Sequence, residues 1–418
     1  MFRKLSSYDE ALEALERFFP SSPVGVEEVS ISDACGRVSA EDVKSPISIP
    51  PFDRAIVDGY AVKASDVYYA EEDRPAVLKT LGSVKVGEEP KISVSKGCAV
   101  EVMTGAQMPK GADAAVMVEY TERRGEDLLV YRSVTVGENV MKKGSDIEVG
   151  ETLVKRGTLL SPFEVGMLAA VGLKTVKVYK KPRVAIISTG PELVSPGEKL
   201  PPGKIYDINS YTLESSVKLC GGDVKYLCRV EDDPEAIRNS LLRAIHEADL
   251  IVTSGGVSVG PYDLIPKILN ELGKPGVILS GIAIKPGKPT TFALLDDKPV
   301  FALPGQPTSA LLTFYLFVRP VIMRMAGMKV TPLKRVRAVV DRRIFPAKGR
   351  RTFVTVTLRR ERGRLVASPV PKGLSGAIKT LAKADGFIEI LENQQFIDEG
   401  EETTVYLMKS LDEMEVQT

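Results

Sequence analysis

The chain has 418 residues, and its 56 Lys and Arg nearly balance its 55 Asp and Glu, so the formal net charge is +1. This length predicts roughly two to four domains, and the balanced charge argues against nucleic acid or an anionic membrane as the main partner, because both favour a basic face. The single histidine, His246, excludes a multi-histidine metal site, and its sequence surroundings are typical of an ordinary helix residue.

The N-terminal segment predicts helices followed by an extended stretch. A capping box at residues 7–10 precedes apolar side chains at helical spacing, which predicts a helix that ends near Phe19, before Pro20. A second short helix is expected around Ala34. Residues 45–52 contain a Pro-Pro pair, which marks a loop, so this stretch is expected to be extended.

Residues 62–132 predict a compact β-rich module. Runs rich in β-branched residues alternate with glycine turns, at residues 77–81, 98–103, 114–120 and 128–131. A helix is predicted over residues 161–172, with Ser161 as N-cap, Pro162 in its first turn and Gly172 as its stop signal. We expect this segment to rejoin the N-terminal helices, which would make the β module an insertion.

Residues 181–327 alternate between predicted strands and helices. The strands are expected at 183–188, 224–229, 250–253 and 300–303, and the helices at 210–220, 233–248, 263–272 and 308–325. This alternation predicts a mostly parallel sheet covered on both faces. Ligands bind at the carboxyl ends of such strands, so the informative loops are 188–193, 253–263 and 303–307. Strands are predicted again at 336–340, 352–358, 365–369, 386–391 and 404–407, as in a small barrel or sandwich.

Three loops of this region are suited to binding an anion. Loop 254–260 joins a strand to a helix, and its glycines allow backbone N–H groups to approach an anion, although a tight turn is the alternative. Loop 284–289 holds Lys285 and Lys288 between prolines that restrict it, which favours an anion between two ammonium groups; the alternative is a solvated turn. Residues 303–307 form either another backbone cradle or the start of a helix.

Acidic residues at loop positions also have two interpretations. Asp58 precedes a glycine, where it can hold a turn. Glu192 follows a strand, where an acid can bind a metal, and a surface acid fits equally well. Asp233 precedes a proline and is expected to cap a helix. Each motif is weak alone, whereas their order along the chain is specific.

In that order, the motifs resemble the molybdopterin molybdenumtransferase family, the MoeA and gephyrin E-domain group, over nearly the whole chain. The matching segments are Pro51-Phe52-Asp53 through Asp58-Gly59-Tyr60-Ala61-Val62, Met103-Thr104-Gly105-Ala106, Gly144-Ser145-Asp146-Ile147, residues 254–260 with Asp263, residues 285–289 and residues 303–307. The resemblance implies a multidomain α/β plus β fold. It has an elongated helical and linker domain (1–45 and 141–180), an inserted β-rich module (46–140), a central mixed α/β domain (181–327) and a C-terminal β-barrel (328–412). The resemblance further implies that the central domain binds molybdopterin and is similar to pterin adenylyltransferases.

The implied reaction inserts molybdate, or tungstate, into adenylylated molybdopterin and releases AMP, with Mg²⁺ as cofactor. The dithiolene sulfurs that receive the metal belong to the substrate, so the protein must supply anion cradles, carboxylates and lysines. The resemblance assigns catalytic roles to Asp58, Thr104, Glu192, Asp232, Asp263, Lys285 and Lys288, with Asp58, Glu192 and Asp263 as metal ligands. It assigns substrate binding to Ser254, Gly255, Gly256, Ser258, Gly260, Pro304, Gly305, Pro307, Arg350 and Ser375, and Asp146 is a weaker match.

The sequence departs from the family pattern at three places. The family usually has Asn-Ser-Ala-Met before Asp-Gly-Tyr, where this chain has Arg54-Ala55-Ile56-Val57. It usually has Thr-Gly-Asp-Glu where Pro191 stands before Glu192, which removes one candidate metal ligand, and Asn where Gln306 stands. The main set of carboxylates and lysines is retained.

The resemblance also implies an elongated homodimer, in which Asp58 and Thr104 of one subunit face Asp263 and the lysine loop of the other. Further implied partners are the upstream pterin adenylyltransferase and the acceptor molybdo- or tungsto-enzymes; neither nucleic acid nor a membrane is expected. The four cysteines form no C-x-x-C pair and no signal peptide is evident, which predicts a cytoplasmic protein. The alternatives are a non-catalytic scaffold of the gephyrin type and a molybdopterin adenylyltransferase. A scaffold could lose Asp58 or Asp263, and both are present.

Overall fold

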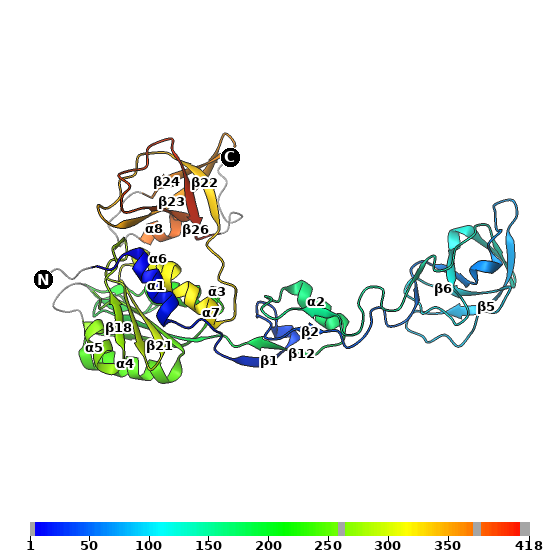
Figure 1. Cartoon of the computed structure of the whole chain (residues 1–418), viewed down its shortest axis with the longest axis horizontal. Coiled ribbons are helices and arrows are strands. Elements are labelled where there is room, and N and C mark those ends of the chain that lie inside the picture. Colours follow the sequence, from blue (N-terminus) through cyan, green and yellow to red (C-terminus); the bar gives the residue numbers. More distant parts are fainter. Residues whose placement is uncertain (1–4, 258–263, 371–377, 410–418) are drawn as a thin grey trace. The chain divides into compact units, whose positions relative to one another are not determined.

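The computed structural model describes residues 5–257, 264–370 and 378–409. The chain divides into two compact units, which are described separately (Figure 1). Unit 1 comprises Met1–Glu28, Gly36–Ala40 and Lys177–Thr418, and unit 2 comprises Val29–Cys35 and Glu41–Val176. Among the residues described, no helix is both long and apolar enough to cross a bilayer.

A six-stranded mixed sheet forms the centre of unit 1. Its strands, in spatial order, are β16 (Asp223–Val230), β13 (Arg183–Thr189), β17 (Leu250–Ser254), β21 (Lys298–Leu303), β20 (Thr291–Leu295) and β18 (Gly276–Ser280). The first four strands run parallel, and the last two join as antiparallel neighbours. The predicted α/β domain is therefore confirmed, with an antiparallel pair at one edge that the sequence pattern did not predict.

Alternate residues of the parallel strands point to opposite faces of this sheet, and helices cover both faces. Ala185 and Ile187 of β13 pack with α4 (Pro234–Glu247) and α5 (Leu264–Leu272). Val184 and Ile186 pack on the other side with α1 (Tyr8–Phe18), α3 (Asn209–Leu219), α6 (Pro307–Thr313) and α7 (Arg319–Met325). Figure 1 shows these two layers of helices. This burial fixes the strand ends from which the functional loops emerge.

The C-terminal part of unit 1 is a closed barrel. Its strands pair in the ring β23 (Arg351–Glu361), β24 (Arg364–Pro369), β22 (Arg335–Val340), β26 (Glu402–Leu407) and β25 (Gly386–Ile390), and β25 returns to β23. The short strand β19 (Ile284–Lys285) adds to β23 in parallel. All five predicted C-terminal strands are present, and the ring that they form is a barrel rather than a sandwich.

Arg351 connects this barrel to helix α1. Its guanidinium contacts carboxylate oxygens of Asp9, Glu389 and Glu392 at 3.3, 3.1 and 3.0 Å, and its side chain is only 13% exposed. The guanidinium carbon also lies 5.0 Å from the ring centroid of Tyr8. One partly buried cation thus links the start of β23 with both α1 and the end of β25.

Unit 2 is built on a second six-stranded sheet. Its order is β7 (Ala114–Met117), β4 (Gly59–Val62), β6 (Cys98–Val102), β5 (Ala76–Val84), β9 (Asp127–Val130) and β8 (Thr121–Arg124). Alternate apolar residues of these strands form two small cores on its two sides. Helix α2 (Pro162–Ala170) begins at the predicted N-cap, Ser161, in a capping box with Glu164.

Short two-stranded pairings complete the chain. They are β1 (Val26–Ser30) with β12 (Thr175–Tyr179), β2 (Val43–Lys44) with β11 (Thr152–Val154), β3 (Arg54–Ala55) with β10 (Val140–Met141), and β14 (Leu193–Val194) with β15 (Ile205–Tyr206). A further short helix, α8, spans Ile378–Lys383, and 3-10 turns occur at Ala64–Asp66 and Val118–Tyr120.

Three predicted elements differ from the structure. The short helix expected around Ala34 is a single 3-10 turn, Ile31–Asp33, which ends just before that residue. The strand expected over 114–120 ends at Met117 and continues as a 3-10 turn. The helix expected over 308–325 has a π-helical segment, Phe314–Val318, between α6 and α7, so its α-helical hydrogen bonding is interrupted.

Candidate functional site

Three loops of unit 1 begin side by side at the carboxyl ends of β13, β17 and β21. Ser188 pairs with Ser254, and Ser254 pairs with Leu303, so the three strands end level with one another. Glu192, the 254–260 loop and the 303–307 loop follow these ends directly. The structure therefore brings together the starts of the three loops that the strand pattern selected.

The glycine loop is held tightly against strand β13. Gly255 has a φ of +96°, and a Cβ at this position would lie 2.3 Å from the carbonyl oxygen of Thr189, so only glycine fits. The Gly255 N–H donates to the Leu303 carbonyl at 3.2 Å. This hydrogen bond corrects part of the predicted cradle, because the Gly255 N–H is not free for an anion.

Asn209, the first residue of α3, joins two of these loops, and sequence reasoning missed it. Its Nδ2 donates to Ser254 Oγ at 2.7 Å and to the Gly305 carbonyl oxygen at 2.7 Å. Ser254 Oγ in turn donates to the Pro304 carbonyl at 3.4 Å. The one signal in the sequence was the position of Asn209 just before an apolar helical pattern. Such a position indicates the start of a helix and does not indicate a link between loops.

Three buried polar atoms at these strand ends have no partner among the residues described. They are Asn209 Oδ1, Thr189 Oγ1 and Thr253 Oγ1, on residues that are 7%, 4% and 0% exposed. A buried acceptor without a hydrogen bond is unfavourable. These atoms are therefore positions at which a bound ligand would gain hydrogen bonds.

Two predicted acids follow neighbouring strands of the same sheet. Glu192 lies after β13 and Asp232 after β16, and both are exposed. The Gly190 N–H donates to the Val230 carbonyl at 3.1 Å, which ties these two strand ends together. The Glu192 carboxylate lies over the backbone of Gly190, where an added Cβ would be 2.7 Å from Oε2. Asp233, as predicted, caps α4 through the Ala236 N–H at 2.8 Å.

The lysine loop is a defined turn rather than an open chain. Thr290 closes it, because its backbone N–H and its hydroxyl donate to the Gly287 carbonyl at 3.1 and 2.7 Å. The Ile282 N–H donates to the Lys288 carbonyl at 2.9 Å. The Lys285 side chain is exposed and that of Lys288 is partly exposed.

Strand pairing places Arg350 beside this loop. Lys285 of β19 pairs with Thr352 of β23, and the Arg351 N–H donates to the Ala283 carbonyl at 3.0 Å. Arg350 directly precedes β23. The structure therefore groups Lys285 and Arg350, two residues that are far apart in the sequence, at one junction of the barrel and the α/β sheet.

Asp58 and Thr104 lie together in unit 2, at the ends of neighbouring strands β4 and β6. Both are exposed, and the Asp58 carbonyl accepts from the Val118 N–H at 2.9 Å. Hydrogen bonds from the backbone and then the side chain of Thr104 hold the pKa of Asp58 below its usual range. Asp146, the weaker match, is an exposed residue whose N–H donates to Ile49.

Four predicted site residues, Ser258, Gly260, Asp263 and Ser375, lie outside the described residues. Within the described part of the chain, no three His, Cys, Asp or Glu side chains gather into a metal site. Pro304 and Gly305 lie between β21 and α6, and Pro307 is the first residue of that helix.

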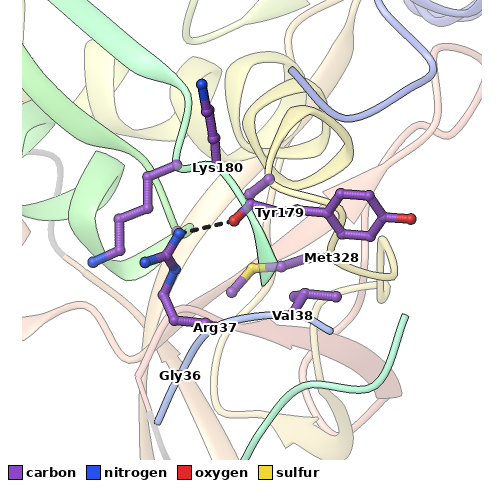
Figure 2. A pocket seen from close by; sticks show the side chains of 9 residues that line it. Gly36, Arg37, Val38, Tyr179, Lys180 and Met328 are labelled. Carbon is purple, nitrogen blue, oxygen red and sulfur yellow. Dashed lines mark hydrogen bonds between the residues drawn. The ribbon is translucent and has the colours of Figure 1, made fainter. Parts of the chain in front are cut away.

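Unit 1 also has a small pocket, and none of the residues that line it belongs to these loops (Figure 2). Arg37 spans it, donating to the Tyr179 carbonyl at 2.9 Å and pairing with Glu27. Lys180 and Met328 also line it. Because the guanidinium is already engaged, this pocket is best explained as part of the packing around β12, and it includes none of the predicted site residues.

Comparisons with known proteins agree with this arrangement of elements. Residues 6–172 match the family described as MoeA N-terminal region (domain I and II), residues 185–324 match the probable molybdopterin binding domain, and residues 337–408 match the MoeA C-terminal region (domain IV).

Curated relatives and a solved structure cover most of the chain. It is 37% identical over 303 residues to a molybdopterin molybdenumtransferase of Nostoc sp., covering 72% of this chain and 69% of that protein. It is 33% identical over 386 residues to one of Bacillus subtilis, covering 91% and 89%. The crystal structure of a molybdopterin biosynthesis moeA protein from Pyrococcus horikosii matches with a TM-score of 0.86 and 43% identity, covering 97% of this chain and 100% of that one.

Proposed function

Because the chain belongs to the MoeA family and is a transferase of molybdenum cofactor biosynthesis, we propose that it joins molybdate to adenylylated molybdopterin and releases AMP. Molybdate and the adenylylated pterin are its substrates. The observation that carries the proposal is the junction of β19 and β23, which groups Lys285 with Arg350 next to the sheet whose strand ends carry the glycine loop.

The chemistry of these residues suits two anionic substrates. Lysine and arginine side chains neutralise oxyanions and phosphates, and Arg350 adds a planar donor group beside the point charge of Lys285. The loops after β17 and β21 line the binding site for the pterin. Asn209 and Thr189 each have a polar atom there without a hydrogen-bond partner among the described residues. The protein's contribution to the reaction is thus to hold two anions close together and to stabilise the negative charge on the departing phosphate.

We propose Mg²⁺ as the cofactor, and the donor set fits this ion. Mg²⁺ is usually bound by one or two carboxylates together with substrate phosphates, rather than by a complete protein cage. The exposed carboxylate of Glu192, at the end of β13 and near Asp232, is such a partial site. Glu192, Asp58 and Asp263 are the proposed ligands. When bound, the ion supplies neutralisation of phosphate charge.

We further propose that the protein works as a homodimer in which Asp58 and Thr104 of one subunit complete the site of the other. An apolar surface on unit 2 supports a partner copy. Helix α2 is apolar along most of its length, and only Leu168 of it is buried. Phe163 is 85% exposed and Leu159 53% exposed, which is typical of an interface residue rather than of a free surface.

The proposal extends to the domain organisation, the cellular location and the partner proteins. We propose four domains, at 1–45 with 141–180, 46–140, 181–327 and 328–412, and this division is supported by the separate sheets. A cytoplasmic location is supported by the four free cysteines. The upstream pterin adenylyltransferase and the acceptor enzymes are the expected partners.

Incubation with adenylylated molybdopterin, Mg²⁺ and either molybdate or tungstate tests the function, with AMP release followed over time. We expect AMP release that requires both the oxyanion and Mg²⁺. Comparing the two oxyanions decides which is the preferred substrate. Absence of AMP release from a folded protein with both oxyanions would favour the scaffold alternative.

A further inference from the structure

Asn209 donates to two of the loops at the strand ends at once. Its Nδ2 reaches Ser254 Oγ of the loop after β17 and the Gly305 carbonyl of the loop after β21, each at 2.7 Å. The carbonyl of Gly305 can only accept, so the NH₂ group must face it, which fixes the orientation of the amide. Oδ1 therefore points elsewhere.

The start of helix α3 is built to hold this side chain in place. Asp207 accepts from the Ser210 N–H at 3.1 Å and from the Ser210 hydroxyl at 2.5 Å, and it is 4% exposed. The Asp207 N–H in turn donates to the Val194 carbonyl at 2.9 Å, and the Ile205 N–H donates to the Glu192 carbonyl at 2.8 Å. The same helix start is thus connected to the third loop, which carries Glu192.

The free oxygen of this amide indicates that the link faces a ligand and is more than a structural support. Asn209 is 7% exposed, yet Oδ1 has no hydrogen-bond partner among the described residues. A buried amide used only for structure normally has both ends paired. An unpaired acceptor between loops that bind substrate is satisfied when the substrate brings an N–H or O–H group.

We propose that Asn209 is a positioning residue, which holds the 254–257 and 303–307 loops at the separation that the pterin substrate requires. This inference rests on the proposed function, since it is the binding of adenylylated molybdopterin that gives the two loops their role. The residue acts through Ser254 and Gly305, and its remaining oxygen accepts a hydrogen bond from the bound pterin.

Hydrogen exchange followed by mass spectrometry tests the link without any substrate. In Asn209→Ala the Gly255 N–H, which donates to Leu303, should exchange about tenfold faster or more, because the loops that it joins are no longer held by the amide. Peptides covering residues 250–257 and 300–306 report this change. Ser216→Ala is the matched control: Ser216 lies on the same helix and is 6% exposed, but its hydroxyl donates to the Thr212 carbonyl within the helix.

Kinetics of AMP release test the positioning role. Asn209→Ala should lower kcat/KM by about 30-fold, the effect of losing two buried hydrogen bonds, and most of the loss should appear as a higher KM for adenylylated molybdopterin. Ser216→Ala should keep the wild-type kcat and KM. Aspartate is almost the same size as asparagine but cannot donate to the Gly305 carbonyl, so Asn209→Asp should behave as Asn209→Ala does. If Asn209→Ala does not fold, Asn209→Asp is used in its place.

The outcomes separate this inference from the proposed function. If the wild type releases no AMP, the proposed function is wrong, and the exchange experiment still decides whether Asn209 holds the loops. If the wild type is active and either Asn209 variant keeps wild-type kcat and KM, the positioning role is overturned. Faster exchange with unchanged kinetics would likewise overturn it, because the link would then be purely structural.

Discussion

Thr104 directs two hydrogen bonds to a single oxygen of Asp58. Its backbone N–H lies 2.7 Å from Asp58 Oδ1 and its hydroxyl 3.0 Å from the same atom. The other carboxylate oxygen, Oδ2, has no hydrogen bond with the residues that the structure describes. Thr104 therefore keeps Asp58 charged and oriented while leaving one oxygen for a ligand.

The Thr104→Val substitution tests this pair through pH dependence. Hydrogen bonds to the charged form lower the pKa of Asp58 in the folded protein, so activity that needs its carboxylate is present above that pKa and is lost as the pH falls through it. Removing the hydroxyl leaves the backbone donor, so the pKa should rise only partly. The acid limb of the kcat/KM profile for AMP release should move to higher pH. Thr121→Val, which removes an exposed hydroxyl bonded to Val118, should leave the limb in place.

Neutralising Asp58 or Glu192, two of the three proposed metal ligands, should abolish most activity. Asp58→Asn and Glu192→Gln keep the shape of each side chain but lose its charge, and we expect about 100-fold slower AMP release or worse. Circular dichroism should show a folded protein, because both residues are exposed. Glu198→Gln, an exposed acid nearby in the chain, should retain wild-type rates. Equal rates for Glu192→Gln and Glu198→Gln would remove Glu192 from the site.

The two lysines of the 284–289 loop should matter for binding and not for stability. Lys285→Ala and Lys288→Ala should each weaken molybdate binding about tenfold, because each removes a charge-assisted hydrogen bond to an anion. The melting temperature should change by no more than about 2 °C. Lys274→Ala is an unusually close control, since Lys274 is exposed and also begins a Lys-Pro-Gly sequence. Titration calorimetry that found the same affinity for all three variants would make the loop a plain turn.

Mixed dimers test whether the site is shared between subunits. If Asp58 of one chain serves Glu192 of the other, co-refolding Asp58→Asn with Glu192→Gln makes about half of the dimers mixed. Each mixed dimer has one intact site, so AMP release should recover to about a quarter of the wild-type rate.

The control places both substitutions on one chain and refolds that chain with wild type. A shared site then gives about a quarter of the wild-type rate, whereas a site within one chain gives about half. Native mass spectrometry confirms that the chains have mixed. No recovery in the first mixture, with half activity in the second, would show that each site belongs to a single chain.

Arg351 should be important for stability. Replacing it by Met leaves Glu389 and Glu392 partly buried without their cation, which typically costs about 3 kcal/mol. Arg337→Met is the control on the same barrel, because Arg337 pairs with Glu402 where both side chains are more than half exposed, and it should cost less than about 1 kcal/mol. Urea unfolding followed by circular dichroism measures both. If both substitutions lowered the free energy of unfolding by the same amount, the contacts of Arg351 with its four neighbours would stabilise the protein no more than an ordinary surface ion pair does.

Local signals in the sequence predicted most elements, and they failed where tertiary contacts decide. The capping box at Ser7 and the N-cap at Ser161 act within one turn of helix, so the sequence predicts them, and both are present. Strands β18 and β20 were missed because they pair antiparallel at the edge of an otherwise parallel sheet. One signal was available. Asp296 and Asp297 both have positive φ in the two-residue turn between β20 and β21, and Asp tolerates this backbone region better than most residues do.

The proposed site residues divide in the same way. Asp58, Thr104 and the lysine loop could be proposed from the sequence because their motifs are short and contiguous. Asn209 was missed because its role arises from Ser254 and Gly305, which lie 45 and 96 residues away. The use of the Gly255 N–H by Leu303 was likewise invisible, since it depends on two strands ending level with one another. Contacts between segments distant in the sequence, rather than unusual residue types, account for both failures.

The sheet of unit 2 has two outer strands, and each is protected from aggregation in a different way. Strand β8 carries Glu122, Arg123 and Arg124, all exposed, and charges on an edge strand oppose pairing with another molecule. Strand β7 is apolar, but its Ala115 N–H donates to the Glu138 carbonyl and its carbonyl accepts from Asn139 Nδ2 at 2.8 Å. Its outer edge is therefore already occupied by the chain's own loop. Substitutions that shorten this loop or neutralise β8 should lead to fibrous self-association, even where activity is retained.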